Sequence, residues 1–288
     1  MPKTSIAMHA LSKFLPDNFD PAGGLTLLSG KGAYPRLVAD RARAAGMDVS
    51  LIAIIDEVDD EFVATFPQDR VHWIKVGQLG KFLSSLEKLR SRYFMMAGQV
   101  APKRLFSGLV PDLKAALILA RLKERNAHTI FGAIADEAEK IGVTQLDARA
   151  FMDDQLASAG TLVGKEKNIE PFALEYGIKI AKECARLDIG QGVVVSGGTV
   201  TAVEAYEGTD KMLRRCVDIP KKNPLYVKTV KPGHDYRFDV PCFGLRTLES
   251  MEIGGISAAA LESENVVILD KENVFAEARR KGITIVGY

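Results

Sequence analysis

The densest group of side chains that could act on a charged substrate lies within residues 227–241. It contains two lysines, two aspartates and an arginine: Lys228, Lys231, Asp235, Arg237 and Asp239. The last three stand at alternate positions, so an extended segment would place them on one face. Cations can hold phosphate oxygens, and a carboxylate can bind a metal or activate water, so the run suits pyrophosphate chemistry. The alternative is a solvated edge strand with alternating charges, and Pro232 and Pro241 fit such an edge.

A second polar cluster lies where a predicted hairpin strand turns into a helix. Glu204, Glu207 and Asp210 supply three carboxylates, with Gly208 and Thr209 between them. Carboxylate oxygens are ligands that Mg²⁺ accepts in proteins. Thr209 or Asp210 can instead cap the helix, because a side-chain oxygen at its start accepts from free backbone N–H groups. Spacing alone leaves the metal site and the cap both open.

Two glycine-containing turns follow predicted buried strands. Residues 30–32 (Gly-Lys-Gly) lead into a helix whose N-terminus favours an anion. Residues 98–102 (Gly-Gln-Val-Ala-Pro) follow another strand. Ligands of open α/β sheets bind beyond the carboxyl ends of the strands, so the two turns could meet over one ligand. The spacing matches neither a P-loop nor the dinucleotide fingerprint, and a tight turn and a plain loop remain the structural alternatives.

Alternating strand and helix patterns would position these turns. Strands are predicted over residues 24–29, 49–55, 71–76 and 93–97, and helices over residues 35–45, 80–91, 111–123 and 129–141. This order is typical of a small doubly wound parallel sheet. We therefore predict the α/β class, with a weakly structured appendage at residues 1–22 and a Rossmann-like domain with a helical connector at residues 23–160.

A C-terminal mixed α/β domain is predicted for residues 161–288. Its first part comprises a helix at 171–187, a hairpin around Gly197-Gly198, a short helix at 209–216 and a strand at 225–230. We expect a loop between the domains at 159–164, a helical region at 247–263 and a β-α-β unit at 266–286.

Composition and charge exclude several classes of protein. The 288 residues carry a formal net charge of +1, so there is no basic excess for general nucleic-acid binding. No run of about 18 apolar residues indicates a membrane span, and the first residues lack the apolar run of a signal peptide. The three cysteines are widely spaced, which argues against a disulfide scaffold and a zinc ribbon.

From about residue 24 to its end, the sequence resembles the LpxI type of UDP-2,3-diacylglucosamine pyrophosphatase. The matching blocks occur in the order of the family: Gly30-Lys31-Gly32-Ala33-Tyr34-Pro35, Ala97-Gly98-Gln99-Val100, Asp188-Ile189-Gly190-Gln191-Gly192, Glu207-Gly208-Thr209-Asp210, Lys228-Thr229-Val230-Lys231-Pro232 and Arg237-Phe238-Asp239-Val240-Pro241. The position before Asp235 is His234, where the family usually has glutamine. Each block alone is modest, but their order is specific.

The resemblance implies a hydrolase of lipid A biosynthesis. It would cleave the pyrophosphate of UDP-2,3-diacylglucosamine with Mg²⁺ or Mn²⁺, giving UMP and 2,3-diacylglucosamine 1-phosphate (lipid X). The family's catalytic aspartate corresponds to Asp239, and we expect Asp235, Arg237 and Lys228 to assist it. Asp239 and Asp210 are the expected metal ligands.

The resemblance also implies which regions contact the substrate. These residues lie in the glycine turns, the Gly-Gln-Gly block, the Glu-Gly-Thr block and the second lysine: Gly30, Gly32, Ala33, Ala97, Gly98, Gln99, Gln191, Gly192, Glu207, Gly208, Thr209 and Lys231. We further expect a cytoplasmic homodimer that meets the inner-membrane surface peripherally, because its substrate is a lipid.

Two other functions compete with hydrolysis. A Rossmann-type oxidoreductase could use Asp56 or Glu57 as its ribose ligand, but its glycine pattern is missing. A non-catalytic module that senses a nucleotide or lipid would bind the same ligand without turning it over. Metal-dependent turnover would separate the hydrolase from the module.

Overall fold

The computed structural model describes residues 11–100, 111–122, 127–165, 168–219 and 222–288. It divides into two compact units, of which unit 1 comprises Met1–Asp153 with Asp235–Asp239, and unit 2 comprises Asp154–His234 with Val240–Tyr288. The sequence-based boundary at 160/161 therefore differs from the structural division at two places, residues 154–160 and residues 235–239. Each unit is described by itself.

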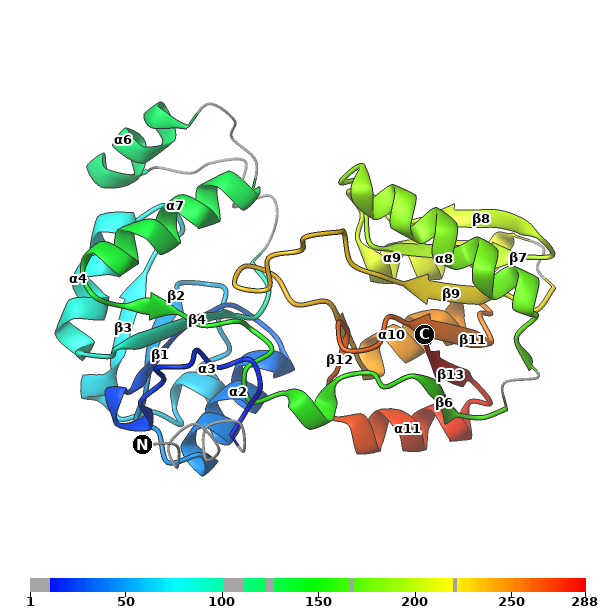
Figure 1. Ribbon diagram of the computed structural model, residues 1–288, viewed down its shortest axis with the longest axis horizontal. Coiled ribbons are helices and arrows are strands. Elements are labelled where there is room, and N and C mark those ends of the chain that lie inside the picture. Colours follow the sequence, from blue (N-terminus) through cyan, green and yellow to red (C-terminus); the bar gives the residue numbers. More distant parts are fainter. Residues whose placement is uncertain (1–10, 101–110, 123–126, 166–167, 220–221) are drawn as a thin grey trace. The chain divides into compact units, whose positions relative to one another are not determined.

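Unit 1 is built on a five-stranded sheet in the order β3-β2-β1-β4-β5, with every pair parallel (Figure 1). Its strands are β1 Leu25–Ser29, β2 Val49–Ile54, β3 Val71–Ile74, β4 Tyr93–Ala97 and β5 Thr144–Gln145. Its helices are α2 Ala33–Ala44, α3 Asp60–Val63, α4 Leu79–Leu89, α6 Leu113–Arg121 and α7 Ala127–Lys140. Short 3₁₀ helices occupy Pro21–Gly23, Gln68–Arg70 and Asp153–Gln155. The predicted Rossmann-like parallel sheet is confirmed.

Alternate residues of the central strands pack on opposite faces of this sheet, as period-two alternation requires. Ile52 of β2 and Phe94 of β4 join Phe82 and Leu86 of α4 in one buried cluster. The rings of Phe82 and Phe94 meet at 5.5 Å in an edge-on arrangement. The strands β1, β2 and β4 are thus nearly free of solvent, which explains their continuous apolar sequence, whereas the edge strand β3 is partly exposed.

The described part of the predicted appendage is ordered rather than weakly structured. Leu15 and Phe19 are buried, and the Phe19 ring lies 4.7 Å from the ring of Tyr93. The backbone N–H of Asp20 donates to the Tyr93 hydroxyl at 2.8 Å. Residues 11–22 therefore belong to the packing of unit 1, and residues 1–10 lie outside the described part of the chain.

Unit 2 contains a six-stranded sheet in the order β6-β13-β11-β9-β7-β8 and a two-stranded parallel pair, β10-β12. The strands are β6 Gly160–Val163, β7 Gly192–Ser196, β8 Thr199–Val203, β9 Leu225–Lys228, β10 Cys242–Phe243, β11 Ala258–Leu261, β12 Val267–Ile268 and β13 Thr284–Gly287. The helices are α8 Pro171–Arg186, α9 Thr209–Arg214, α10 Leu245–Ile253 and α11 Lys271–Arg280, with a 3₁₀ helix at Arg215–Asp218. Parallel and antiparallel pairs both occur, so the predicted mixed α/β domain is confirmed.

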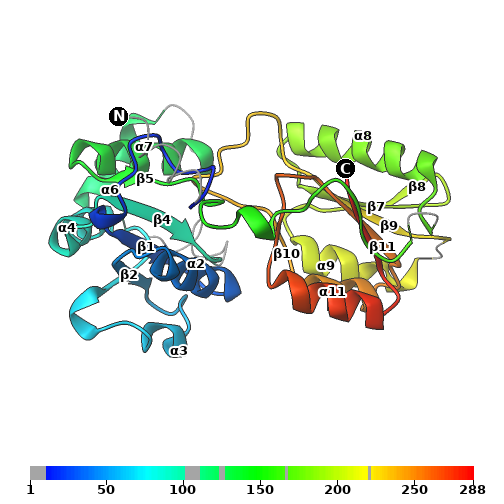
Figure 2. The same cartoon turned by 60° about the horizontal axis from the view of Figure 1, so that its bottom comes forward.

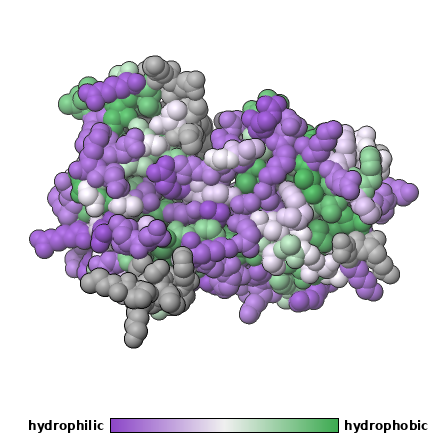
Figure 3. All heavy atoms as spheres, in the orientation of Figure 1, coloured by the Kyte–Doolittle hydropathy of each residue, from purple (hydrophilic) through white to green (hydrophobic). Residues whose placement is uncertain are grey.

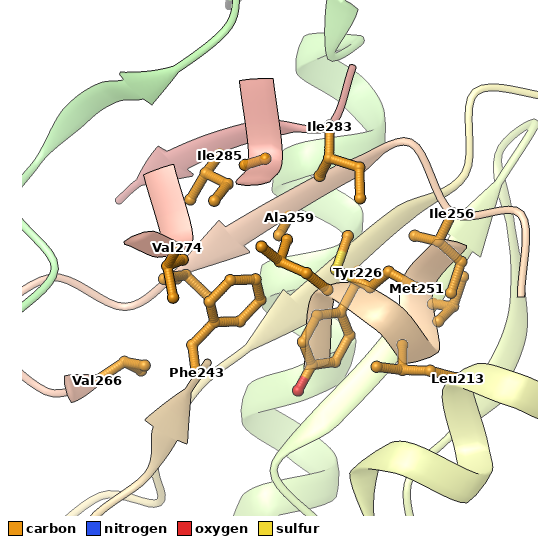
Figure 4. Close-up of a cluster of buried hydrophobic side chains, with 14 of the residues drawn as sticks. Leu213, Tyr226, Phe243, Met251, Ile256, Ala259, Val266, Val274, Ile283 and Ile285 are labelled. Carbon is orange, nitrogen blue, oxygen red and sulfur yellow. The ribbon is translucent and has the colours of Figure 1, made fainter. Parts of the chain in front are cut away.

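Helices cover both faces of the unit 2 sheet (Figure 2). Val195 and Val227 point to α8 and pack with Ala181. Tyr226 and Ala259 point to the opposite face, where the helices α9, α10 and α11 supply Leu213, Met251 and Val274 (Figure 4). The neighbouring residues Tyr226 and Val227 therefore serve different cores, which shows that β9 lies inside a two-sided sheet.

Three local predictions for unit 2 are wrong. The expected loop at 159–164 contains β6, which pairs antiparallel with β13. The expected helical region at 247–263 ends at Ile253, and Ala258–Leu261 forms β11 between β9 and β13. The last strand pairs with β11 whereas β12 pairs with β10, so 266–286 is not a simple β-α-β unit. Alanine favours helices, but complete burial between two strands overrides that preference.

In the described part of the chain, no helix is long and apolar enough to cross a membrane. Apolar side chains are nevertheless exposed on α6, visible in green at the upper left of Figure 3. Leu113 is 79% exposed and Leu117 is 52% exposed.

Candidate active site

The two glycine turns of unit 1 lie side by side at the carboxyl ends of β1 and β4. The N–H of Gly30 donates to the carbonyl of Ala97 at 2.9 Å. Beyond it, Lys31 and Gln99 exchange two backbone hydrogen bonds, each of 2.9 Å. The two turns thus form one small backbone platform at the sheet edge where α/β proteins bind ligands.

Glycine is required at two positions of this platform because two backbones approach closely. A Cβ on Gly30 would lie 2.3 Å from the carbonyl oxygen of Gln99. A Cβ on Gly98, whose φ is +90°, would lie 2.7 Å from the carbonyl oxygen of Lys31. Gly32 differs, since its φ is +108° and no atom lies within 4 Å of its Cβ position. It precedes Ala33, the first residue of α2, and gives this helix no side-chain cap.

The segment Asp235–Asp239 packs against unit 1 through backbone and ring contacts. Its Tyr236 carbonyl accepts from Ala148 N–H at 2.9 Å, and its Arg237 carbonyl accepts from Gln145 Nε2 at 2.6 Å. The guanidinium of Arg149 lies 3.5 Å from the centre of the Tyr236 ring. In addition, Phe238 stacks on Phe131 of α7 at 5.9 Å. These contacts explain why the five residues Asp235–Asp239 belong to unit 1, although the residues before and after them belong to unit 2.

Ala148 links this segment to the first turn of α2. Its carbonyl accepts a hydrogen bond from the Tyr34 hydroxyl, and its N–H donates to Tyr236. Ala148 therefore connects Tyr34 of the Gly-Lys-Gly-Ala-Tyr-Pro block to Tyr236, the residue that directly precedes the Arg-Phe-Asp block. Sequence spacing could not reveal this connection.

Within the segment, Asp235 holds Arg237. Its carboxylate oxygens lie 3.0 and 3.2 Å from the Arg237 Nε, and one lies 2.7 Å from Nη2. The hydrogen bonds that Arg237 donates to the Asp235 carboxylate raise the pKa of Arg237, so the guanidinium keeps its charge. Asp239, the expected catalytic residue, is exposed at the end of the segment. Asp235 thus orients a cation and leaves Asp239 as the exposed carboxylate.

The polar residues of unit 2 gather at one end of β7, β8 and β9. Gly192 is paired with Lys228 across β7 and β9, and its carbonyl accepts from Glu204 N–H at 2.8 Å. The carbonyl of Gln191 accepts from Thr229 N–H at 2.9 Å. Three sequence blocks that are far apart along the chain therefore meet at this sheet end.

The sequence indicated Glu204 only as one of three clustered carboxylates and assigned it no contact. Its Oε1 accepts from the Thr209 hydroxyl at 2.7 Å. A Cβ on Gly190 would lie 2.2 Å from the Glu204 carbonyl oxygen, and a Cβ on Gly192 would lie 2.7 Å from Oε2. The two glycines of the Asp-Ile-Gly-Gln-Gly block therefore make room for Glu204, and they were the signal that could have indicated it.

A buried polar pair accompanies Glu204. Glu204 Oε2 and the Tyr226 hydroxyl are both buried without a hydrogen-bond partner among the described residues. Burial raises the pKa of Tyr226 to about 12, and the charge of Lys228 opposes this rise. Tyr226 and Lys228 are two residues apart on β9 and so point to the same face. Lys228 itself is only 5% exposed, so its charge acts within a largely dry environment.

The other predicted charged residues of unit 2 are held in ion pairs. Lys231 pairs with Asp188 at 2.9 Å. Glu207 pairs with Arg215 at 3.0 Å, and a backbone hydrogen bond together with this pair lowers the pKa of Glu207. Asp210, an expected metal ligand, is bound by Arg246 through two guanidinium nitrogens. Gly208 precedes α9 with a φ of +80° and open space at its Cβ position.

No preformed metal cluster of three His, Cys, Asp or Glu side chains occurs within the described ranges of the chain. The two expected ligands belong to different units, Asp239 to unit 1 and Asp210 to unit 2. Mg²⁺ keeps several waters and is commonly held by one or two carboxylates together with substrate phosphates. An exposed Asp239 fits that mode of binding, whereas Asp210, engaged by Arg246, does not fit it in this arrangement.

The fold and these groups of residues define a class of protein: an α/β protein of two units, one with a parallel sheet and one with a mixed sheet, whose backbone turns and charged side chains suit a phosphorylated ligand. The chain belongs to the LpxI family. The model of the LpxI N-terminal domain matches residues 24–155, and that of the LpxI C-terminal domain matches residues 158–286. The chain is 30% identical over 275 residues to UDP-2,3-diacylglucosamine pyrophosphatase LpxI of Caulobacter vibrioides, covering 91% of this chain and 96% of the relative. The resemblance inferred from the sequence blocks is thereby confirmed.

Proposed function

We propose that this protein hydrolyses the pyrophosphate bond of UDP-2,3-diacylglucosamine, giving UMP and lipid X for lipid A biosynthesis. The observation that carries the proposal is the position of the Arg-x-Asp-x-Pro block, held through Ala148 beside the first turn of α2. The similarity to a relative of this named activity over 91% of the chain supports it.

The chemistry asks the protein to offset negative charge and to direct one water. Water adds its oxygen to one phosphorus, the bridging P–O bond breaks, and the bridging oxygen leaves with the other phosphate. The water gives up a proton in this step, and the proton would pass through the Asp239 carboxylate to the bulk solvent. Arg237, Lys228 and Lys231 would offset the charge that grows on phosphate oxygens. Asp239 would accept the hydrogen bond of the attacking water and so orient it.

We include a divalent metal, Mg²⁺ or Mn²⁺, in this proposal. Asp239 would hold it together with substrate phosphate oxygens, and the metal would supply charge neutralisation at the pyrophosphate. Asp210 would join only if Arg246 released it, since the two side chains are paired. This part of the proposal is supported by the donor type and exposure of Asp239.

The residues that we propose to contact the substrate come from both units. In unit 1 the proposed contacts are Gly30, Gly32, Ala33, Ala97, Gly98 and Gln99. In unit 2 they are Gln191, Gly192, Glu207, Gly208, Thr209 and Lys231. Gly32 and Gly208 are the strongest of these, because each precedes a helix, has a positive φ and has open space where a side chain would be. Gly30 and Gly98 support the site by letting the backbones approach.

The proposal extends to a homodimer that meets the inner-membrane surface peripherally. The substrate carries two acyl chains, and Leu113 and Leu117 give α6 an apolar outer face. Sedimentation with and without vesicles of anionic phospholipid tests the membrane contact. The molar mass of the purified protein, measured by light scattering after size-exclusion chromatography, tests whether it is a dimer.

The experiment that tests the activity is turnover of UDP-2,3-diacylglucosamine by purified protein with Mg²⁺, Mn²⁺ or EDTA. We expect metal-dependent release of UMP and lipid X in equal amounts. Binding of the substrate by folded protein without release of either product, at any metal concentration, would favour the non-catalytic sensing module instead.

A further inference from the structure

One carboxylate outside the predicted site holds the backbone between the two lysines. Beyond the end of β9, Glu262 Oε2 accepts from Val230 N–H at 2.9 Å and from the Thr229 hydroxyl at 2.5 Å. Thr229 and Val230 are the residues that separate Lys228 from Lys231. Glu262 follows directly after β11, the neighbour of β9 in the sheet.

The charge of Glu262 is balanced by a lysine from the helix that covers this face. The ammonium of Lys182 lies 2.7 Å from both oxygens of Glu262 and 3.2 Å from the carbonyl oxygen of Val230. Asn265 Nδ2 donates to Glu262 Oε1 at 3.0 Å. The side chain of Glu262 is only 14% exposed, so the ion pair is shielded from much of the solvent. Charge-assisted hydrogen bonds of this kind are stronger and shorter than neutral ones.

Two further contacts fix the same segment. The Lys228 carbonyl accepts from Glu262 N–H at 3.1 Å and from the Tyr288 hydroxyl at 3.2 Å. Thr229 is fully buried. The backbone of residues 228–230 is therefore anchored by Glu262, by Lys182 of α8 and by Tyr288, at the point where β9 ends.

We infer that Glu262 is a positioning residue, which through Thr229 and Val230 sets where Lys228 and Lys231 present their charges to the substrate. The inference rests on the proposed function, since it concerns the placement of cations on phosphate oxygens. A displacement of about 1 Å from a change remote from the reacting atoms can cost about 100-fold in rate. A buried ion pair that only stabilised the fold would affect activity through the amount of folded protein alone.

The test compares Glu262→Gln with a matched control, Glu183→Gln. The control removes the same charge from an exposed ion pair in unit 2, that of Glu183 and Arg186 at 2.9 Å. We expect Glu262→Gln to lower kcat by roughly 10- to 100-fold in the folded fraction. We expect the control to leave kcat unchanged. An unchanged kcat in folded Glu262→Gln would overturn the inference.

A double-mutant comparison separates positioning from a merely structural role. In the background of Lys231→Ala, Glu262→Gln should lower kcat by clearly less than in the wild type, because coupled residues are not additive. Equal fold-changes in both backgrounds would contradict the inference. If Glu262→Gln does not fold, Thr229→Val takes its place, since it removes one hydrogen bond to Glu262 and keeps the side-chain shape.

Amide hydrogen exchange tests the role of Glu262 without any measurement of turnover, and so independently of the proposed function. The Val230 amide should exchange faster in Glu262→Gln than in the wild type, and unchanged exchange would overturn the inference. If wild-type protein shows no turnover, the proposed function has failed, while the exchange measurement still decides whether Glu262 holds the segment.

Discussion

The two units contribute to the proposed site in different ways. In unit 1, backbone groups build the platform, and glycines at 30 and 98 allow its two turns to approach. In unit 2, charged side chains gather at a sheet end, and most of them are held by other charged side chains. Yet Gly32 and Gly208 play the same part, each preceding a helix with a positive φ and no side-chain cap.

If the proposed site binds phosphate, the two units would do so by two different physical routes. A backbone platform cannot be titrated and depends on steric fit, so it should be sensitive to single methyl groups. A charged network depends on pairing, so it should be sensitive to pH and to the removal of one partner. Substitutions in each unit can test this contrast between steric sensitivity and sensitivity to charge pairing.

The largest effect is expected at Asp239. We predict that Asp239→Ala lowers kcat by roughly 10²- to 10⁴-fold, the range for loss of a group that directs proton transfer. Its thermal unfolding should match that of the wild type, because the side chain is exposed. Asp69→Ala, another exposed aspartate of unit 1, serves as the control and should keep full turnover. Near-normal turnover of Asp239→Ala would remove this residue from the mechanism.

The steric sensitivity of unit 1 is tested by Gly30→Ala. The new Cβ would lie 2.3 Å from the Gln99 carbonyl oxygen, so the two turns must separate. We expect a loss of about 1–3 kcal/mol in the free energy of unfolding, as for an overpacked core. Gly132→Ala is the matched control, since this glycine lies in α7 with no atom within 4 Å of its Cβ position. Alanine there should be neutral or stabilising, as measured by urea denaturation.

The pairing sensitivity of unit 2 is tested at Thr209. Thr209→Val removes the hydroxyl that donates to Glu204 Oε1 at 2.7 Å. Glu204 Oε2 has no hydrogen-bond partner among the described residues, so the buried carboxylate would also lose the hydrogen bond that its Oε1 accepts from Thr209. We expect a loss of about 1–2 kcal/mol in unfolding free energy. Thr209→Ser keeps the hydroxyl and should recover most of it, whereas equal losses would show that the hydrogen bond contributes nothing.

The smallest effect concerns pH. Burial alone would raise the pKa of Glu262, but hydrogen bonds from Lys182, Thr229 and Val230 outweigh it and lower the pKa below its usual 4.5. Since the folded pKa lies below the unfolded one, the stabilisation is present above the unfolded pKa and is lost as pH falls through the folded pKa. The stability difference between wild type and Glu262→Gln, on the order of 1 kcal/mol, should therefore be full at neutral pH.

Chemical denaturation of both proteins between neutral pH and about pH 3 measures this difference. It should begin to shrink as the pH falls through the unfolded carboxyl pKa of 4.5 and continue to shrink down to the lowered folded pKa. A difference that is constant down to the lowest pH would show that the pKa of Glu262 is the same in the folded and the unfolded protein, which contradicts the lowered folded pKa.

Local patterns sufficed for much of the fold. The strands β1 to β4 of unit 1, α8 and the hairpin at Gly197-Gly198 could be predicted because each is marked by an apolar run, a helical period or a glycine turn. The two-residue strand β5 carries no such mark. β11 could not, because its alanines favour a helix and only the flanking strands make it a strand. β6 could not, because its pairing with β13 joins residues at opposite ends of unit 2.

The residues of the candidate site also fall into those that local patterns could predict and those that they could not. Residue types and the family blocks indicated Asp239, the lysines and the glycine turns, and Gly192 and Gly208 with them. They did not indicate Glu262 or Lys182, because the roles of these residues come from partners far away in the sequence. Nor did they indicate that residues 235–239 pack with unit 1, which depends on contacts to Ala148 and Gln145.

The most direct test of the central claim is ³¹P NMR of UDP-2,3-diacylglucosamine incubated with the purified protein and Mg²⁺. The account predicts that the two pyrophosphate resonances disappear together and that two phosphomonoester resonances, those of UMP and lipid X, appear in equal intensity. Pyrophosphate resonances that persist with folded wild-type protein, or the appearance of any other phosphorus product, would contradict it.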